Sequence, residues 1–102
     1  MIEQNDNDTT INYFGSWGSY RVPFVPQNPI SREEAEQRKN YYIAYYNSER
    51  QLICFEKFAN GKLEWKDEYV YWNNGKLKMR RMTKADKSVI IQQFDHRGRI
   101  VL

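Results

Sequence analysis

A short pattern that recurs along the second half of the chain constrains the fold more than any other feature. It reads aromatic residue, turn, Gly, basic residue, aliphatic residue, and it occurs with identical spacing at Tyr71–Leu77 and Phe94–Ile100. Tyr46–Leu52 repeats the pattern with Arg50 where the Gly would stand, and a looser copy ends at Asn60–Leu63. Because Asn and Gly accept the positive φ of tight hairpin turns, each copy predicts two antiparallel strands joined by a turn.

The segments between these turns alternate in polarity as β-strands do. The links are too short for crossover helices, so we expect an antiparallel meander over residues 41–102. The expected strands are Tyr41–Tyr46, Gln51–Phe58, Lys62–Trp72, Lys76–Met82, Ser88–Phe94 and Arg99–Leu102. The link between the last two long strands is polar, and we expect a loop there.

The N-terminal third of the chain has a different composition. Residues 1–12 are polar and acidic and predict a disordered tail. Residues 13–30 are rich in Gly, Pro and aromatic groups, and Pro23, Pro26 and Pro29 favour an extended path over a helix or a central strand. We interpret this segment as an arm that lies across the main domain; a proline-rich ligand for another protein is the alternative.

One helix is predicted, over residues 31–40. Ser31 can cap its first turn, and Glu34 completes a capping box. With Ala35 as its main apolar residue, it should be a surface helix. The whole chain therefore predicts one α+β domain over residues 13–102, with an antiparallel meander of five to six strands, one short helix and an N-terminal aromatic and proline-rich arm.

Composition argues against a membrane or secreted protein. Of the 102 residues, 40% are hydrophobic and 28% are charged. No apolar run approaches the roughly 18 residues of a membrane span, and the first residues lack the regions of a signal peptide. The one cysteine, Cys54, lies in an apolar, strand-like run, so we interpret it as a small buried hydrophobe rather than a reactive thiol. We expect a cytoplasmic protein that does not associate with membranes.

Catalytic and metal-binding signatures are weak. His96 is the only histidine and lies in a predicted turn; we interpret it as a turn residue, with a general base as the alternative. One His and one Cys provide no zinc ligand set, and no Gly-rich phosphate loop occurs. The closest approach to an acid/base set or cation site is a group of carboxylates on one strand, Glu64, Asp67 and Glu68. They alternate with lysines, as on a solvated strand face, so we expect no catalytic residue, metal site or cofactor.

A local excess of positive charge marks the candidate binding surface. The net charge is +3, and residues 76–87 hold six basic residues against Asp86 alone. The candidate surface combines these cations with neighbouring aromatic residues: Tyr69, Tyr71, Trp72, Lys76, Lys78, Arg80, Arg81 and Lys84. Phosphate contacts and stacking from such a set would suit a single-stranded nucleic acid. The aromatic-glycine signatures of an RNA-recognition sheet are missing.

We favour a non-enzymatic protein-binding module over the other functions. Tyr, Trp, Arg and Met are enriched at the cores of interfaces, and this chain is rich in them. The expected role is that of a small bacterial or phage inhibitor or immunity-type protein that occludes a surface of its partner. A net charge of +3 suits a partner with an acidic face. The alternatives are single-stranded nucleic-acid binding and a structural or scaffold role, and a half-covered aromatic sheet is also compatible with a homodimer.

The repeated turns also resemble a known class of hairpin repeats. Tyr71–Leu77 and Phe94–Ile100 are similar to the YD repeats of bacterial Rhs-type proteins and, more distantly, to MORN-like repeats in some bacterial antitoxins. The likeness covers about residues 41–102, and Arg50 and the shifted Phe58 depart from it. The resemblance implies a hairpin-repeat architecture with a shell-building role and no catalysis. With its arm and helix, the whole chain resembles a small family of stand-alone bacterial domains.

Overall fold

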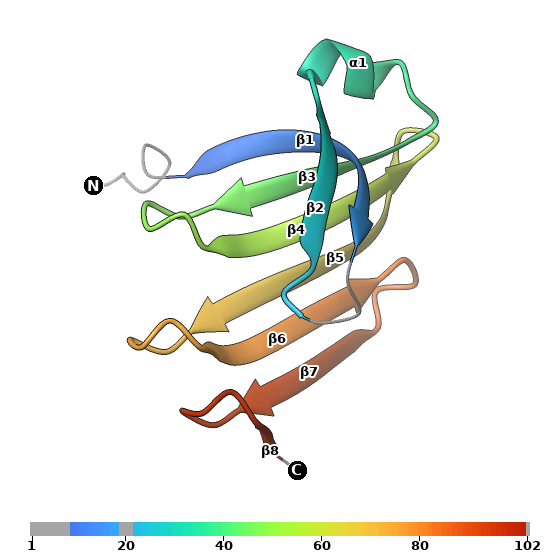
Figure 1. Ribbon diagram of the computed structural model, residues 1–102. Helices are drawn as coiled ribbons and strands as arrows, with labels where there is room; N and C mark the ends of the chain where they lie inside the picture. The colour runs from blue at the N-terminus through green and yellow to red at the C-terminus, as the bar shows by residue number, and fades with distance from the viewer. Residues whose placement is uncertain (1–8, 19–21, 102) are drawn as a thin grey trace, which may run out of the picture.

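The computed structural model describes residues 9–18 and 22–101, and these form one antiparallel sheet of eight strands. The order across the sheet is β2-β1-β3-β4-β5-β6-β7-β8, so only β1 and β2 depart from chain order (Figure 1). The strands are β1 (Thr10–Gly18), β2 (Val25–Ile30), β3 (Asn40–Tyr46), β4 (Leu52–Ala59), β5 (Lys62–Tyr71), β6 (Leu77–Lys84), β7 (Val89–Phe94) and β8 (Ile100–Val101).

The expected α+β fold with five to six strands is wrong. The sheet has eight strands, and the helix has only five residues. The six strands expected from residue 41 onward are present as β3 to β8, each within two residues of its expected bounds. The two additional strands come from the segment interpreted as an arm, which is hydrogen-bonded into the sheet.

The two N-terminal strands join the sheet because their backbone N–H and C=O groups find hydrogen-bonding partners there. β1 pairs with β3 up to Phe14 and with β2 from Tyr13 onward, and Gly15 follows the change of partner. β2 carries Pro26 and Pro29, which have no N–H to donate, but it lies at the edge of the sheet, where one side of the strand needs no partner. Proline therefore excluded a central strand here but not an edge strand.

β1 also begins earlier than the predicted end of the tail. Thr10 already pairs with Tyr46 of β3, inside the range predicted to be disordered. The remainder of the predicted tail, residues 1–8, lies outside the described residues.

The helix α1 (Arg32–Glu36) begins where predicted but ends sooner than residue 40. The Ser31 hydroxyl oxygen accepts a hydrogen bond from the backbone N–H of Glu34 at 3.0 Å, as the capping sequence predicts. Ala35 is fully buried, and it is the only buried residue of the helix. The helix ends because the polar residues that follow offer no further apolar side chain to pack, and a helix of this length is not stable alone.

Four hairpin turns share one hydrogen-bond pattern. In each, the N–H of the first residue donates to the carbonyl of the fifth, and the N–H of the fourth donates to the carbonyl of the first. The turns are residues 47–51, 72–76, 84–88 and 95–99. The fourth residue has a positive φ in every case: Arg50 (63°), Gly75 (87°), Lys87 (71°) and Gly98 (85°). The third of these turns is the segment for which the sequence predicted only a polar loop.

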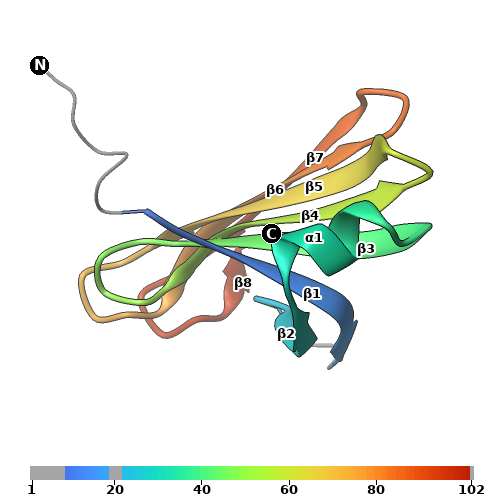
Figure 2. The same ribbon diagram turned by 90° about the horizontal axis from the view of Figure 1, so that it is seen from above.

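The core lies on one side of the sheet, where the β1–β2 hairpin curls across it (Figure 2). We call this side the covered face and the other side the open face. Phe55 is fully buried, and its ring stacks on Tyr42 with centroids 5.4 Å apart. Phe24 lies 6.2 Å from the Phe55 ring and 4.5 Å from Trp17, ring centroid to ring centroid. Burying an aromatic side chain of this size stabilises a fold by roughly 1.5–3 kcal/mol, so these rings hold the hairpin on the sheet.

A chain of polar contacts runs beside the aromatic core. Asp67 is 0% exposed, and its carboxylate accepts hydrogen bonds from the Tyr69 hydroxyl at 2.8 Å and from Arg80 Nε at 2.9 Å. The Tyr69 oxygen accepts the N–H of Phe24 at 3.3 Å, and Arg80 Nη1 donates to Gln92 at 3.1 Å. The contacts link the end of the β1–β2 connection to β5, β6 and β7. The interpretation of Asp67 as part of a solvated strand face was wrong, because its side chain points into the covered face.

Candidate protein-binding surface

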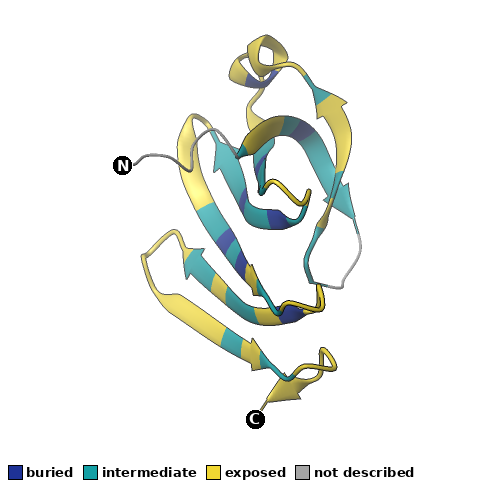
Figure 3. Cartoon of the chain, turned by 90° about the vertical axis from the view of Figure 1, so that its left-hand side faces the viewer, coloured by how far each residue is buried: buried dark blue, intermediate teal, exposed yellow. Residues whose placement is uncertain are grey.

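Exposed aliphatic side chains gather at the C-terminal edge of the sheet. Among the described residues, nine large hydrophobic side chains are exposed, and five of them belong to β7 and β8. These five are Val89 (42% exposed), Ile90 (45%), Ile91 (55%), Ile100 (49%) and Val101 (50%). We call residues 89–101 the C-terminal wing; Figure 3 shows it largely in the colour of exposed residues. Exposed apolar patches rimmed by polar groups typically mark sites of protein interaction.

The start of the wing is exposed because neither face of Val89–Ile91 is packed. Ile90 pairs with Met82 and lies on the covered face, whereas Ile91 pairs with Arg81 and lies on the open face. The β1–β2 hairpin packs over the central strands and leaves Ile90 uncovered (Figure 1). Both sides of β7 therefore present aliphatic groups to solvent.

An aromatic and basic cluster lies beside the wing at the β5–β6 turn. The Trp72 ring stacks on His96 with centroids 3.8 Å apart, and Lys78 Nζ lies 4.8 Å from the centroid of the Trp72 ring. The Trp72 indole N–H donates to the Phe94 carbonyl at 3.2 Å, and the Asn74 side chain donates to the His96 carbonyl at 2.8 Å. These contacts fix the wing's own turn against the β5–β6 turn.

A shallow hollow of about 410 Å³ opens between this cluster and the wing. It is lined by Trp72, Lys78, Met79, Gln93, Phe94, Asp95, His96 and Val101. The lining combines aromatic rings and aliphatic groups with the amide of Gln93 and one charge of each sign, Lys78 and Asp95. A mainly apolar hollow of this kind suits an apolar anchor residue of a partner.

The charge around the wing is positive. Each of its two turns holds one carboxylate and two cations. Hydrogen bonds from the side chain and backbone of Ser88 lower the pKa of Asp86, and those from the backbone N–H groups of Arg99 and Arg97 lower the pKa of Asp95. The cations of the same two turns form no salt bridge within the described part of the chain: Lys84, Lys87, Arg97 and Arg99. The wing thus presents apolar side chains with positive charge at both ends.

The residues predicted as one binding surface lie in separate places. Tyr69 is only 3% exposed, and Arg80 is held by Asp67 on the covered face. Tyr71 is half-buried, and its hydroxyl donates to the carbonyl of Leu52. These side chains stabilise the fold and are not free to contact a partner.

The other five predicted residues are more accessible but are not contiguous. Trp72, Lys76 and Lys78 belong to the cluster beside the wing, so this part of the prediction remains a candidate surface. Arg81 lies on the open face of β6. Lys84 lies at the end of β6 that is far from the Trp72 cluster. The basic stretch therefore does not form a single continuous stripe.

Sequence reasoning missed the wing itself. Val89, Ile90 and Ile91 are consecutive aliphatic residues, and such a run places apolar groups on both faces of a strand. In a single sheet with one covered face, at least one of these groups must remain exposed. This signal was available, but the strand was interpreted only as part of the meander.

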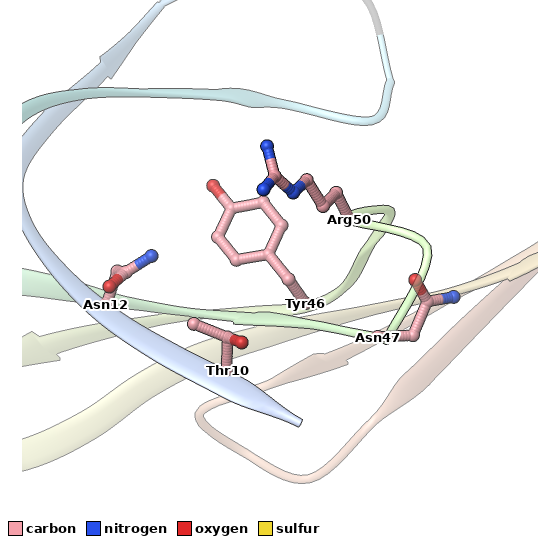
Figure 4. Close-up of a pocket in the computed structure, with 5 residues that line it drawn as sticks. All are labelled: Thr10, Asn12, Tyr46, Asn47 and Arg50. Carbon is pink, nitrogen blue, oxygen red and sulfur yellow. The ribbon is translucent and has the colours of Figure 1, made fainter. Parts of the chain in front are cut away.

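A second hollow, of about 380 Å³, opens on the covered face at the start of β1 and the end of β3 (Figure 4). It is lined by Thr10, Asn12, Tyr46, Asn47 and Arg50. Figure 4 shows the Arg50 guanidinium beside the ring of Tyr46, and burial raises the pKa of the Tyr46 hydroxyl. The lining offers one cation and neutral polar groups without a carboxylate or imidazole base, so it does not assemble acid–base chemistry.

The other reactive groups of the described chain are similarly constrained. Burial raises the pKa of the Cys54 thiol to about 12, so the thiol stays protonated near neutral pH. Glu64 forms a salt bridge with Lys57 at 2.7 Å. Within residues 9–18 and 22–101, no group of three or more His, Cys, Asp or Glu side chains is placed to hold a metal ion.

The model of a family of unknown function, DUF6156, matches residues 6–102. The chain belongs to this family. The matched residues include all eight strands of the sheet. No curated protein and no solved structure matches the chain. Among the described residues, no helix has the length and apolar character needed to cross a membrane.

Proposed function

We propose that this protein is a non-enzymatic protein-binding module whose partner docks on the C-terminal wing. The observation that carries the proposal is the concentration of half-exposed aliphatic side chains on β7 and β8, beside a stacked Trp72–His96 pair. An interface core of this kind is apolar and aromatic, with a charged rim. Here the rim is basic, which favours a partner with an acidic face.

Single-stranded nucleic acid is the second candidate, supported by the cations around Trp72. Stacking requires aromatic rings with an accessible face. Tyr69 and Tyr71 are packed in the covered face, and Trp72 is in contact with His96 and Lys78. The aliphatic wing would also have no role in phosphate binding, so we rank this candidate lower.

The finer parts of the proposal concern the biological setting. We propose a small bacterial or phage inhibitor or immunity-type protein that acts in the cytoplasm by covering a surface of its target; a structural or scaffold role is the alternative. The four turns with one hydrogen-bond pattern support the proposed kinship with YD-type hairpin repeats.

The test is affinity capture from a lysate of the natural source, with and without nuclease, followed by mass spectrometry. The wild-type chain is compared with Ile91→Glu and with the control Ile11→Glu. Ile11 and Ile91 lie on the same open face at opposite ends of one row of paired residues, with similar exposures of 50% and 55%. We expect a stoichiometric protein partner that survives nuclease, is lost with Ile91→Glu and is retained with Ile11→Glu. Partners that disappear on nuclease treatment would reject the proposal in favour of nucleic acid.

A further inference from the structure

The two edges of the sheet differ in how well they are protected against pairing with another strand. β2 carries Pro26, Pro29 and a left-handed residue, Asn28 (φ 60°), all of which hinder the addition of a strand. β7 reads Val-Ile-Ile-Gln-Gln-Phe, with no proline, glycine or charge, and its pairing with β6 shows no bulge. β8 pairs with β7 only at Gln93 and Phe94.

The backbone of β7 leaves identifiable hydrogen-bonding groups open. The carbonyl of Ser88 accepts the N–H of Lys84, so the backbone of Ser88 points toward β6. The N–H of Asp95 donates to the carbonyl of Arg99, so the backbone of Asp95 points away from β6. Because alternate residues of an antiparallel strand bond to the same neighbour, Val89 and Ile91 direct their N–H and C=O groups outward. No strand of the described chain pairs with them there.

We infer that β7 is a docking edge for an extended, acidic segment of a partner protein, which adds to the sheet as a further strand alongside residues 89–91. The inference rests on the proposed function and specifies how the partner binds. Backbone groups of Val89 and Ile91 pair with the incoming segment, while the aliphatic side chains on the two faces contact its alternate residues. From Gln93 onward this side of β7 is already paired with β8. The stretch of β7 that can pair with the incoming segment is therefore short.

The positive charge at both ends of β7 favours an acidic segment over a second copy of this chain. The turn at one end of β7 holds Lys84 and Lys87 with Asp86, and the turn at the other end holds Arg97 and Arg99 with Asp95, so each turn has one more cation than carboxylates. The four cations form no salt bridge in the described chain. Antiparallel pairing of β7 with β7 of a second copy would bring the two basic ends together and is opposed by repulsion. An extended segment with Asp or Glu on both sides of a few β-branched residues meets the same edge with opposite charge.

The first experiment selects peptides on the intact chain. A random octapeptide library is panned against the wild-type chain and against Ile91→Pro, with Ile91→Thr as the matched control. Proline at position 91 removes an outward N–H but no bond to β6, and it is tolerated on an edge strand, whereas threonine keeps the N–H and the branched shape. We expect the wild-type chain to enrich acidic, β-branched sequences that bind Ile91→Pro about tenfold more weakly or worse, and Ile91→Thr nearly as well. Equal binding to both variants, enrichment of basic sequences, or no enrichment over Ile91→Pro would overturn the inference.

A second measurement uses the wild-type chain alone and does not depend on the folding of a variant. Amide hydrogen exchange of Val89 and Ile91 should be fast in the free chain and should slow at least about tenfold with a selected peptide bound. Protection that appears elsewhere and leaves these two amides unchanged would refute the strand addition.

The two levels of the proposal fail in different ways. If the captured partner is lost with Ile91→Glu but fully retained with Ile91→Pro, the wing is a binding surface and strand addition is rejected. If capture depends on nucleic acid, the proposed function itself is rejected. A concentration-dependent dimer in sedimentation that dissociates in Ile91→Pro would make a second copy the occupant and would overturn the acidic segment.

Discussion

The N-terminal and C-terminal parts of the sheet are built from similar antiparallel strands, but only the N-terminal part covers apolar side chains of the sheet. β1 and β2 curl back over the central strands, so that Ala44 and Phe55 are fully buried. β7 and β8 continue the sheet beyond this cover, and their aliphatic side chains stay about half exposed. The covered part therefore supplies most of the stability, while the wing retains apolar surface that folding alone does not need.

The largest effect should come from removing the central ring of the covered part. Phe55→Ala is expected to lower the free energy of unfolding by about 3–5 kcal/mol, because it leaves a cavity among rings that cannot collapse freely. Ile91→Ala, at 55% exposure, should change it by less than about 0.5 kcal/mol. Urea denaturation of both variants checks the contrast, and a similar loss for the two would remove the distinction between core and wing.

The buried ion pair should come next. Asp67→Ala leaves Arg80, which is 17% exposed, without its carboxylate and should cost about 3 kcal/mol. The double variant Asp67→Leu with Arg80→Met, which replaces the pair by apolar groups, should recover most of that loss. Thermal unfolding should show that the double variant is more stable than Asp67→Ala. If the two are equally unstable, the stability comes from the attraction within the ion pair and the loss in Asp67→Ala is not due to an isolated charge.

The repeated turns offer a smaller and more local comparison. Gly75→Val should destabilise by about 1–2 kcal/mol, because a β-branched residue resists the φ of 87°. Arg50→Gly, at the same position of another turn with a φ of 63°, should stabilise by about 0.5–1 kcal/mol. Equilibrium unfolding in guanidinium measures both changes, and effects of the same sign would contradict the equivalence of the two turns.

Extremes of pH should loosen the two parts separately. Burial raises the pKa of Cys54 and of Tyr71 to about 12, and it also raises the pKa of Tyr69. These groups ionise more easily in the unfolded chain than in the folded one, so stability is complete below about pH 8 and is lost progressively as the pH rises toward 12. Denaturation measured from pH 7 to 11, with tyrosinate absorbance as the reporter of ionisation, checks the direction.

At the acid end the turns of the wing should respond instead. Hydrogen bonds lower the pKa of Asp86 and of Asp95, so their contribution is present above about pH 4 and is lost as the pH falls below it. The amide protection factors of the turns at 84–88 and 95–99, which are corrected for the intrinsic pH dependence of exchange, should decrease below about pH 4 before those at the centre of the sheet. Simultaneous opening of both regions would argue against separate stabilisation.

The parts of the fold that could be predicted from the sequence are local. β3 to β8 follow one another through short turns, and Asn, Asp and Gly at those turns mark where each strand ends. The pairing of β1 with β3 spans a longer segment and has no turn signature. The two prolines of β2 pointed away from a strand because the sequence does not say which strand lies at an edge.

The candidate site was harder to predict because it depends on what covers each face. Alternation places Asp67 on the same face as Trp65 and Tyr69, so the sequence contained the signal for a buried carboxylate. The lysines beside it suggested a solvated face and obscured that signal. The basic residues of β6 likewise alternate between faces, so Arg80 became a structural residue while Arg81 stayed at the surface.

The stacked Trp72–His96 pair gives the protein a built-in optical reporter. The emission of an indole depends on the groups in contact with its ring, and the Trp72 and His96 ring centroids are 3.8 Å apart at the rim of the wing. A molecule that docks there would separate the rings or shield them from water, and the fluorescence of Trp72 would change. The other two tryptophans, Trp17 and Trp65, pack against the aromatic core. Replacing both by phenylalanine would leave Trp72 as the only tryptophan, and its fluorescence could then report binding without an added label.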